Sequence, residues 1–113
     1  MNEKLLTRDE FREGVFVRDS HKCVMCGAPA KDAHHILERR LFKASHELGG
    51  YYLSNGASLC AEHHITAEKT LISVEEIRER CGITKPKIPE HLYTDTVYTK
   101  WGDPILDNGN RLS

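Results

Sequence analysis

The sequence lacks the features of a membrane-spanning or secreted protein. No apolar run approaches the roughly 18 residues that a membrane helix needs, and residues 1–7 contain no apolar stretch typical of a secretion signal. We therefore expect a cytoplasmic (intracellular) protein with no membrane partner. In such a compartment, disulfides are the poorer explanation for four cysteines.

The sequence also lacks an excess of charge of either sign. It has 16 Lys+Arg against 17 Asp+Glu, and aromatic residues make up only 7% of it. This balance excludes a broadly basic surface of the kind that coats nucleic acid, but leaves room for a local basic groove or a metal that handles phosphate. With 113 residues the chain is one small domain. Small hydrophobic cores often need an additional stabilising cross-link, such as a disulfide or a bound metal ion.

The spacing of cysteines and histidines indicates that this cross-link is a structural zinc ion. Cys23 and Cys26 are separated by two residues in a turn-rich stretch, and Cys60 and His63 repeat that spacing. Four thiolate and imidazole ligands close a tetrahedral zinc site. His64, four residues after Cys60, is an alternative fourth ligand, although the repeated spacing favours His63.

Local signals predict several elements. Thr7 and Glu10 form a capping box that opens a helix over residues 8–18, whose arginines (Arg8, Arg12, Arg18) we expect on a solvated face. Cys81, which has no partner at metal spacing, is expected in the core at the end of a helix that opens at Ser73 and ends at Gly82. Further expectations are strands over residues 33–37 and 51–53, a charged loop or single helical turn over 38–43, an Asn-Gly hairpin turn at 55–56 and a helix over 61–69.

We expect the chain to divide into an N-terminal helical segment (1–20), a central domain (21–82) and a Pro-containing tail of uncertain structure (83–113). Within that tail, the stretch from 93 to 101 fits a strand, a linker or a docking arm.

Three histidines are left after the zinc site is assigned. His34 and His35 are neighbours on the expected strand, so their side chains point to opposite faces unless the strand bends or ends there. His64 points to a different side of its helix from His63. One of the strand pair could share a second metal with His64 while the other acts as a general base. Asn55 could orient that base or fix its loop.

Taken in order, these pieces resemble the HNH nuclease family, whose fold is the ββα-metal (His-Me finger) fold. The family pattern is a Cys-x-x-Cys knuckle, Asp-x-His-His-Ile, an Asn-Gly turn and Leu-Cys-x-x-Cys-His. The resemblance covers residues 16 to about 70. Here the pattern reads Cys23-Val-Met-Cys26, Asp32-Ala-His34-His35-Ile36, Asn55-Gly56 and Leu59-Cys60-Ala-Glu-His63-His64.

The resemblance implies a fold, an activity and residue roles. It implies a small α+β domain with an N-terminal helix and an extra helix after the zinc-bound core. The activity would be metal-dependent hydrolysis of phosphodiester bonds, most plausibly in DNA, leaving 5′-phosphate and 3′-hydroxyl ends. His35 would be the general base, Asn55 would position its loop, and His34 and His64 would hold one catalytic divalent cation, Mg²⁺, Mn²⁺ or another transition metal. The family's last zinc cysteine is His63 here, which a Cys3His zinc site accepts.

Substrate contacts are expected from Arg39, Arg40 and Lys43, which follow the histidine strand and could bind backbone phosphates. The alternative for these three is a solvated charged turn. Neutral overall charge suggests weak binding, and hence help from a partner domain, a homodimer or a special DNA structure. The sequence does not choose between phage, restriction, homing and defence settings. The rival interpretation is a non-catalytic zinc module that binds nucleic acid or protein, and a nuclease that prefers RNA is a third.

Overall fold

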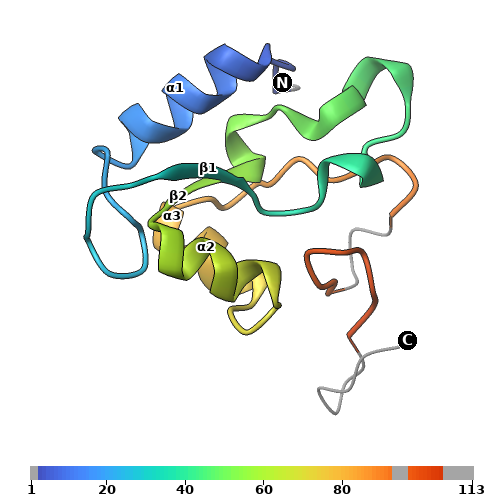
Figure 1. Cartoon of the computed structure of the whole chain (residues 1–113). Coiled ribbons are helices and arrows are strands. Elements are labelled where there is room, and N and C mark those ends of the chain that lie inside the picture. Colours follow the sequence, from blue (N-terminus) through green and yellow to red (C-terminus); the bar gives the residue numbers. More distant parts are fainter. Residues whose placement is uncertain (1–2, 93–96, 106–113) are drawn as a thin grey trace.

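The computed structural model describes residues 3–92 and 97–105 of the chain. It is a small α+β fold built around a two-stranded antiparallel sheet, in which β1 (Asp32–His35) pairs with β2 (Gly56–Leu59). Figure 1 shows α1 on one side of the two strands, and α2 and α3 on the other. The helices are α1 (Arg8–Arg18), α2 (Ala61–Glu68) and α3 (Val74–Cys81), and short 3₁₀ turns span Arg39–Leu41, Ser45–Gly50 and Leu53–Asn55.

Helix α1 begins and ends where the sequence predicts. The Thr7 hydroxyl accepts the Glu10 N–H at 3.2 Å and the Glu10 carboxylate accepts the Thr7 N–H at 2.9 Å, so the capping box is closed in both directions. Phe11 and Val15, four residues apart, are the two buried residues of the helix. They lie so close to Gly56 that a Cβ there would be 2.8 Å from the Phe11 ring. A residue without a side chain at the start of β2 therefore lets α1 lie directly on the sheet.

The core lies between the sheet and the two following helices. All four residues of β2 are buried, and its Leu59 joins a cluster with Ile36, Leu37 and Ile77. Helix α2 follows β2 directly, ending one residue before the predicted helix, so the β1–β2–α2 order matches a zinc-binding ββα unit. Helix α3 is confirmed: Ser73 accepts the Glu76 N–H at 3.0 Å, and Gly82 ends the helix at φ +73°.

The predicted strand over residues 51–53 is wrong. Leu53–Asn55 is a 3₁₀ turn, and the strand that pairs with β1 is Gly56–Leu59, so the Asn55-Gly56 pair is not a hairpin turn. The reason is tertiary: the Asn55 side chain is fully buried and hydrogen-bonds to the backbone of Leu37 and Gly50. The first strand is also shorter than predicted, since β1 begins at Asp32 and ends at His35.

The chain after α3 packs back onto the earlier elements. The Lys87 N–H donates to the Ser54 hydroxyl at 2.8 Å, and the Glu90 N–H donates to the buried Glu47 carboxylate at 3.1 Å. In residues 97–105, the Lys100 ammonium donates to the carbonyl of His35, at the end of β1, at 3.1 Å. The part of the expected 93–101 segment from 93 to 96 lies outside the described residues. Within the described ranges, every helix is too short and too polar to cross a membrane.

Candidate functional site

Three cysteines and one histidine form a cluster that could hold a structural metal ion. Cys23, Cys26, Cys60 and His63 each direct one ligand atom at the others, with all four atoms within 4.8 Å of one another. The Cys26 and Cys60 sulfurs are 3.9 Å apart, and His63 Nδ1 is 3.3 Å from the Cys60 sulfur and 3.6 Å from that of Cys23. Ideal zinc bond lengths place tetrahedral ligands about 3.5–3.8 Å apart. The separations of these donors are therefore compatible with a bound zinc ion.

The backbone prepares this cluster. Gly27, at φ +79°, lets the knuckle close, with its N–H donating to the Cys23 carbonyl at 2.8 Å. Cys60 is the N-cap of α2 and His63 lies in its first turn, so both face the knuckle. Burial raises the pKa of the Cys23 thiol, but hydrogen bonds from nearby backbone N–H groups outweigh it and bring the pKa down to about 7. A thiol that ionises near neutral pH favours metal binding.

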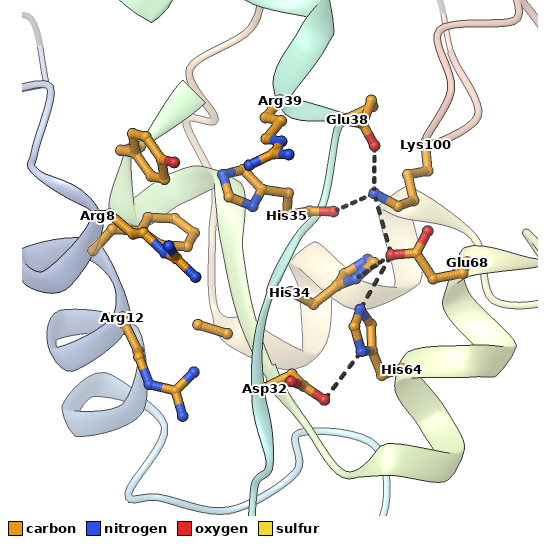
Figure 2. A pocket seen from close by; sticks show the side chains of 13 residues that line it. Arg8, Arg12, Asp32, His34, His35, Glu38, Arg39, His64, Glu68 and Lys100 are labelled. Carbon is orange, nitrogen blue, oxygen red and sulfur yellow. Dashed lines mark hydrogen bonds and ion pairs between the residues drawn. The ribbon is translucent and has the colours of Figure 1, made fainter. Parts of the chain in front are cut away.

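A second group of possible ligands lies on the other side of α2. His34 of β1 and His64 and Glu68 of α2 also place ligand atoms within 4.8 Å of one another. Glu68 Oε1 is 3.1 Å from His64 Nε2 and 3.7 Å from His34 Nδ1 (Figure 2). These separations are close to the roughly 3.0–3.4 Å between neighbouring ligands of a small divalent cation. The structure thus brings together the two histidines predicted to share a cation; that they bind one stays a prediction.

His34 is the most unusual residue of this group. It is 1% exposed, and neither ring nitrogen has a hydrogen-bond partner among the described residues. Burial, reinforced by the charge of Lys100, lowers its pKa well below the ordinary histidine value. The ring is therefore neutral at pH 7, which is the form that binds metal. A buried imidazole with both nitrogens unsatisfied is costly unless a ligand completes it.

His64 is oriented by a carboxylate on each side. Its Nδ1 is 3.1 Å from Asp32 Oδ2, and its Nε2 faces Glu68. When Asp32 accepts the Nδ1 proton, Nε2 is left with a free lone pair beside Glu68 and His34. Carboxylates fix the tautomer of metal-binding histidines in the same way.

His35, the predicted general base, lies beside this group but is not one of its possible metal ligands. Its Nε2 is 3.0 Å from the Gly49 carbonyl oxygen, which can only accept, so Nε2 carries the proton and Nδ1 is the free acceptor. The ring stacks on Phe11 at 4.7 Å and meets the edge of Tyr51. Burial lowers the pKa of His35 to about 4, against the hydrogen bond to Gly49, which raises it. His35 is therefore neutral at pH 7.

Asn55 connects the strand end to the loop that holds His35. Its Oδ1 accepts the Leu37 N–H at 2.9 Å, and its Nδ2 donates to the carbonyls of Leu37 and Gly50 at 3.1 and 3.2 Å. The Gly50 carbonyl is next in sequence to the Gly49 carbonyl, which accepts the hydrogen bond from His35 Nε2. Asn55 thus fixes the backbone around His35 from a buried position and does not itself face the cavity.

A cavity of about 300 Å³ joins these groups. In Figure 2, Arg8 and Arg12 lie across β1 from His64. Within the described part of the chain these two arginines and Arg39 form no ion pair with a carboxylate. The lining residues are Arg8, Phe11, Arg12, Asp32, Ala33, His34, His35, Glu38, Arg39, Tyr51, His64, Glu68 and Lys100.

The expected basic residues fall into different places. Arg39 lines this cavity, and with Arg40 and Lys43 it also lines a shallower hollow of about 530 Å³. The solvated-face prediction is wrong for Arg18, whose guanidinium donates to the carbonyls of Leu53 and Gly56 at 2.7 and 2.6 Å. Those bonds tie the end of α1 to the start of β2.

Most charged residues of the cavity, Glu68 and Lys100 among them, have no site role predicted from the sequence. Glu68 lies four residues after His64, which places both on one face of α2, so this spacing could have revealed it. Lys100 has no local signal, because its position depends on how the tail folds back. Asp32 was part of the quoted motif, but no role was predicted for it.

Comparisons with known proteins give no relative for this chain. No protein-family model, no curated protein and no solved structure matches it.

Proposed function

We propose that this protein is a metal-dependent endonuclease of the HNH type that hydrolyses phosphodiester bonds, with DNA as the favoured substrate. The observation that carries the proposal is the buried, unsatisfied His34 imidazole beside His64 and Glu68. Histidines that served only as surface residues would be solvated and would not leave a buried imidazole without hydrogen-bond partners. The neutral His35 ring lines the same cavity, so a candidate base and a candidate cation site face one space.

The chemistry can be assigned to residues of this chain. His35 Nδ1 takes a proton from a water molecule as the water oxygen bonds to phosphorus, and the bond from phosphorus to the 3′ oxygen breaks. His34, His64 and Glu68 would hold a divalent cation. That cation would supply positive charge at the phosphate and at the departing 3′ oxygen. The products would carry 5′-phosphate and 3′-hydroxyl ends.

The charge around the cavity supports a phosphate substrate. Arg8, Arg12 and Arg39 surround the cavity and lack carboxylate partners among the described residues. Arginine is well suited to hold phosphate oxygens through paired N–H groups. A sugar–phosphate backbone lying between α1 and the turn after β1 would meet these arginines on either side of the reacting group.

The Cys3His cluster has a separate role in this proposal. A zinc ion there would join the knuckle to the first turn of α2, and so hold His64 opposite His34. The rival function, a zinc module that only binds nucleic acid or protein, would use this cluster in the same way. That rival function does not explain why His34, His64 and Glu68 also converge.

Cation dependence on supercoiled plasmid tests the proposal. The zinc-loaded protein, freed of other metals, should nick plasmid only when Mg²⁺ or Mn²⁺ is added. His64→Ala should lose this activity by at least a hundredfold while keeping one bound zinc. His46→Ala, which changes an exposed histidine outside the cavity, is the matched control and should keep full activity. Metal-independent nicking, or equal nicking by the His64 variant, would refute the assignment.

A further inference from the structure

The tail after α3 places a buried lysine against the candidate cation site. Lys100 is 4% exposed, although it follows β1 by more than sixty residues in the sequence. Its Nζ lies 3.6 Å from Glu68 Oε1, 3.5 Å from Glu38 Oε2 and 3.1 Å from the His35 carbonyl oxygen (Figure 2). An ammonium removed from water needs such anionic and carbonyl partners.

The segment that carries Lys100 is itself fixed in place. The Glu38 N–H donates to the Lys100 carbonyl at 2.8 Å, and the Trp101 indole N–H donates to the Glu68 carbonyl at 3.1 Å. The Lys100 ammonium also lies 4.8 Å from the centre of the Trp101 ring. Backbone and indole contacts would suffice to dock the tail, so they do not explain why a charged group is buried here.

The Glu68 carboxylate gives the explanation. One oxygen, Oε1, faces His64 Nε2, His34 Nδ1 and the Lys100 ammonium together. Among the described residues, Lys100 is the one lysine or arginine that lies within ion-pair distance of this oxygen, at 3.6 Å. We propose that Lys100 is a built-in placeholder for the divalent cation. In the metal-free protein its ammonium holds the Glu68 carboxylate toward the two histidines. When the cation binds, the ammonium gives up its ion pair with Glu68 and keeps the one with Glu38.

This inference rests on the proposed function and adds a regulatory property to it. Because an ammonium and a dication compete for one carboxylate, Lys100 lowers the affinity of the site for metal. Even with the screening of bulk water, an ammonium and a dication ~6 Å apart repel each other enough to change the affinity roughly tenfold, and the burial of Lys100 weakens that screening. Lys100 would thus set the metal concentration at which the site fills.

The test is Mn²⁺ binding to the zinc-saturated full-length protein, measured from the electron paramagnetic resonance signal of free Mn²⁺. Lys100→Met should bind Mn²⁺ at least about tenfold more tightly than wild type, while Lys100→Arg, which keeps the charge, should stay within about twofold. Trp101→Phe removes a tail hydrogen bond but keeps the ammonium, so it controls for loosened docking and should bind like wild type. Unchanged or weaker binding by Lys100→Met would overturn the proposal.

A second variant keeps the test decisive if Lys100→Met does not fold. Glu38→Gln leaves Glu68 as the sole carboxylate near the ammonium, so Mn²⁺ binding should weaken at least threefold; an unchanged affinity would count against the placeholder role. The outcome for wild type separates the two proposals. If wild type binds no Mn²⁺ beyond its zinc, the candidate cation site itself is wrong, and the placeholder with it. If wild type binds Mn²⁺ and the variants do not shift, only the role of Lys100 is wrong.

Discussion

Replacing Asn55 with alanine should destabilise the domain strongly, although the residue is polar and lies in a short 3₁₀ turn outside the α-helices and strands. The side chain is fully buried and satisfies three backbone groups: the Leu37 N–H, the Leu37 carbonyl and the Gly50 carbonyl. A buried polar group left without a partner costs about 1–3 kcal/mol. Allowing for water entering the space left by the amide, we expect a loss of about 3 kcal/mol, a large part of the roughly 5–15 kcal/mol typical of whole domains.

Urea unfolding of the zinc-loaded protein, followed by far-ultraviolet circular dichroism, measures this loss. If the free energy of unfolding falls by about 1.5 kcal/mol per molar urea, the urea concentration at the unfolding midpoint should fall by about 2 M. Thr66→Ala is the control, since its hydroxyl makes one exposed hydrogen bond to the Glu62 carbonyl at 2.9 Å; its cost should stay within about 0.5 kcal/mol. A loss below about 1 kcal/mol for Asn55→Ala would refute the view that this side chain holds the two backbone segments together.

Three further outcomes follow from the packing and the thiols. Cys60→Ser should abolish stoichiometric zinc binding and lower the melting temperature sharply, because metal binding contributes directly to folding in small domains; atomic absorption and a thermal melt would show this, and retained zinc would contradict the ligand set. Gly56→Ala should cost about 1–3 kcal/mol in a urea titration, since its Cβ would lie 2.8 Å from the Phe11 ring; a neutral effect would mean that α1 does not pack as described. Burial raises the pKa of Cys81 to about 11, so its thiolate fraction at pH 8 is only about 10⁻³. In the zinc-loaded protein, iodoacetamide should therefore label Cys81 slowly at pH 8 and faster as the pH rises toward 11, and rapid labelling at pH 8 would contradict its burial.

Local chemistry explains why parts of the fold could be predicted from the sequence. The Thr7–Glu10 capping box, the Ser73 cap and the left-handed Gly82 depend on residues within one turn of each other, so sequence patterns define them. The cysteine and histidine spacing likewise predicts the Cys3His cluster, because those ligands belong to a tight knuckle and one helix start. The choice of His63 over His64 followed from that spacing, and the geometry places His63 in the cluster.

The features that the sequence could not predict depend on distant contacts. Tyr51-Tyr52-Leu53 has the composition of a strand, but the buried Asn55 side chain draws the chain into a turn, and the pairing passes to Gly56–Leu59. Lys100 reaches the cavity through long-range contacts of its segment with the end of β1 and with Glu68 of α2, which no local pattern predicts. The arginines of α1 have ordinary helical spacing, and only packing against the sheet separates Arg18, which binds backbone carbonyls, from Arg8 and Arg12, which line the cavity.

The most direct test of the central claim is the rate of plasmid nicking by His35→Ala relative to wild type. Both zinc-loaded proteins would be incubated with supercoiled DNA and Mn²⁺, and the nicked product treated with DNA ligase. We expect wild type to make nicks that ligase reseals, because the nicks carry 5′-phosphate and 3′-hydroxyl ends. The variant should nick at least a hundredfold more slowly with zinc content and folding retained, as the proposed mechanism requires. Equal nicking by the two proteins, or no nicking by wild type, would contradict it.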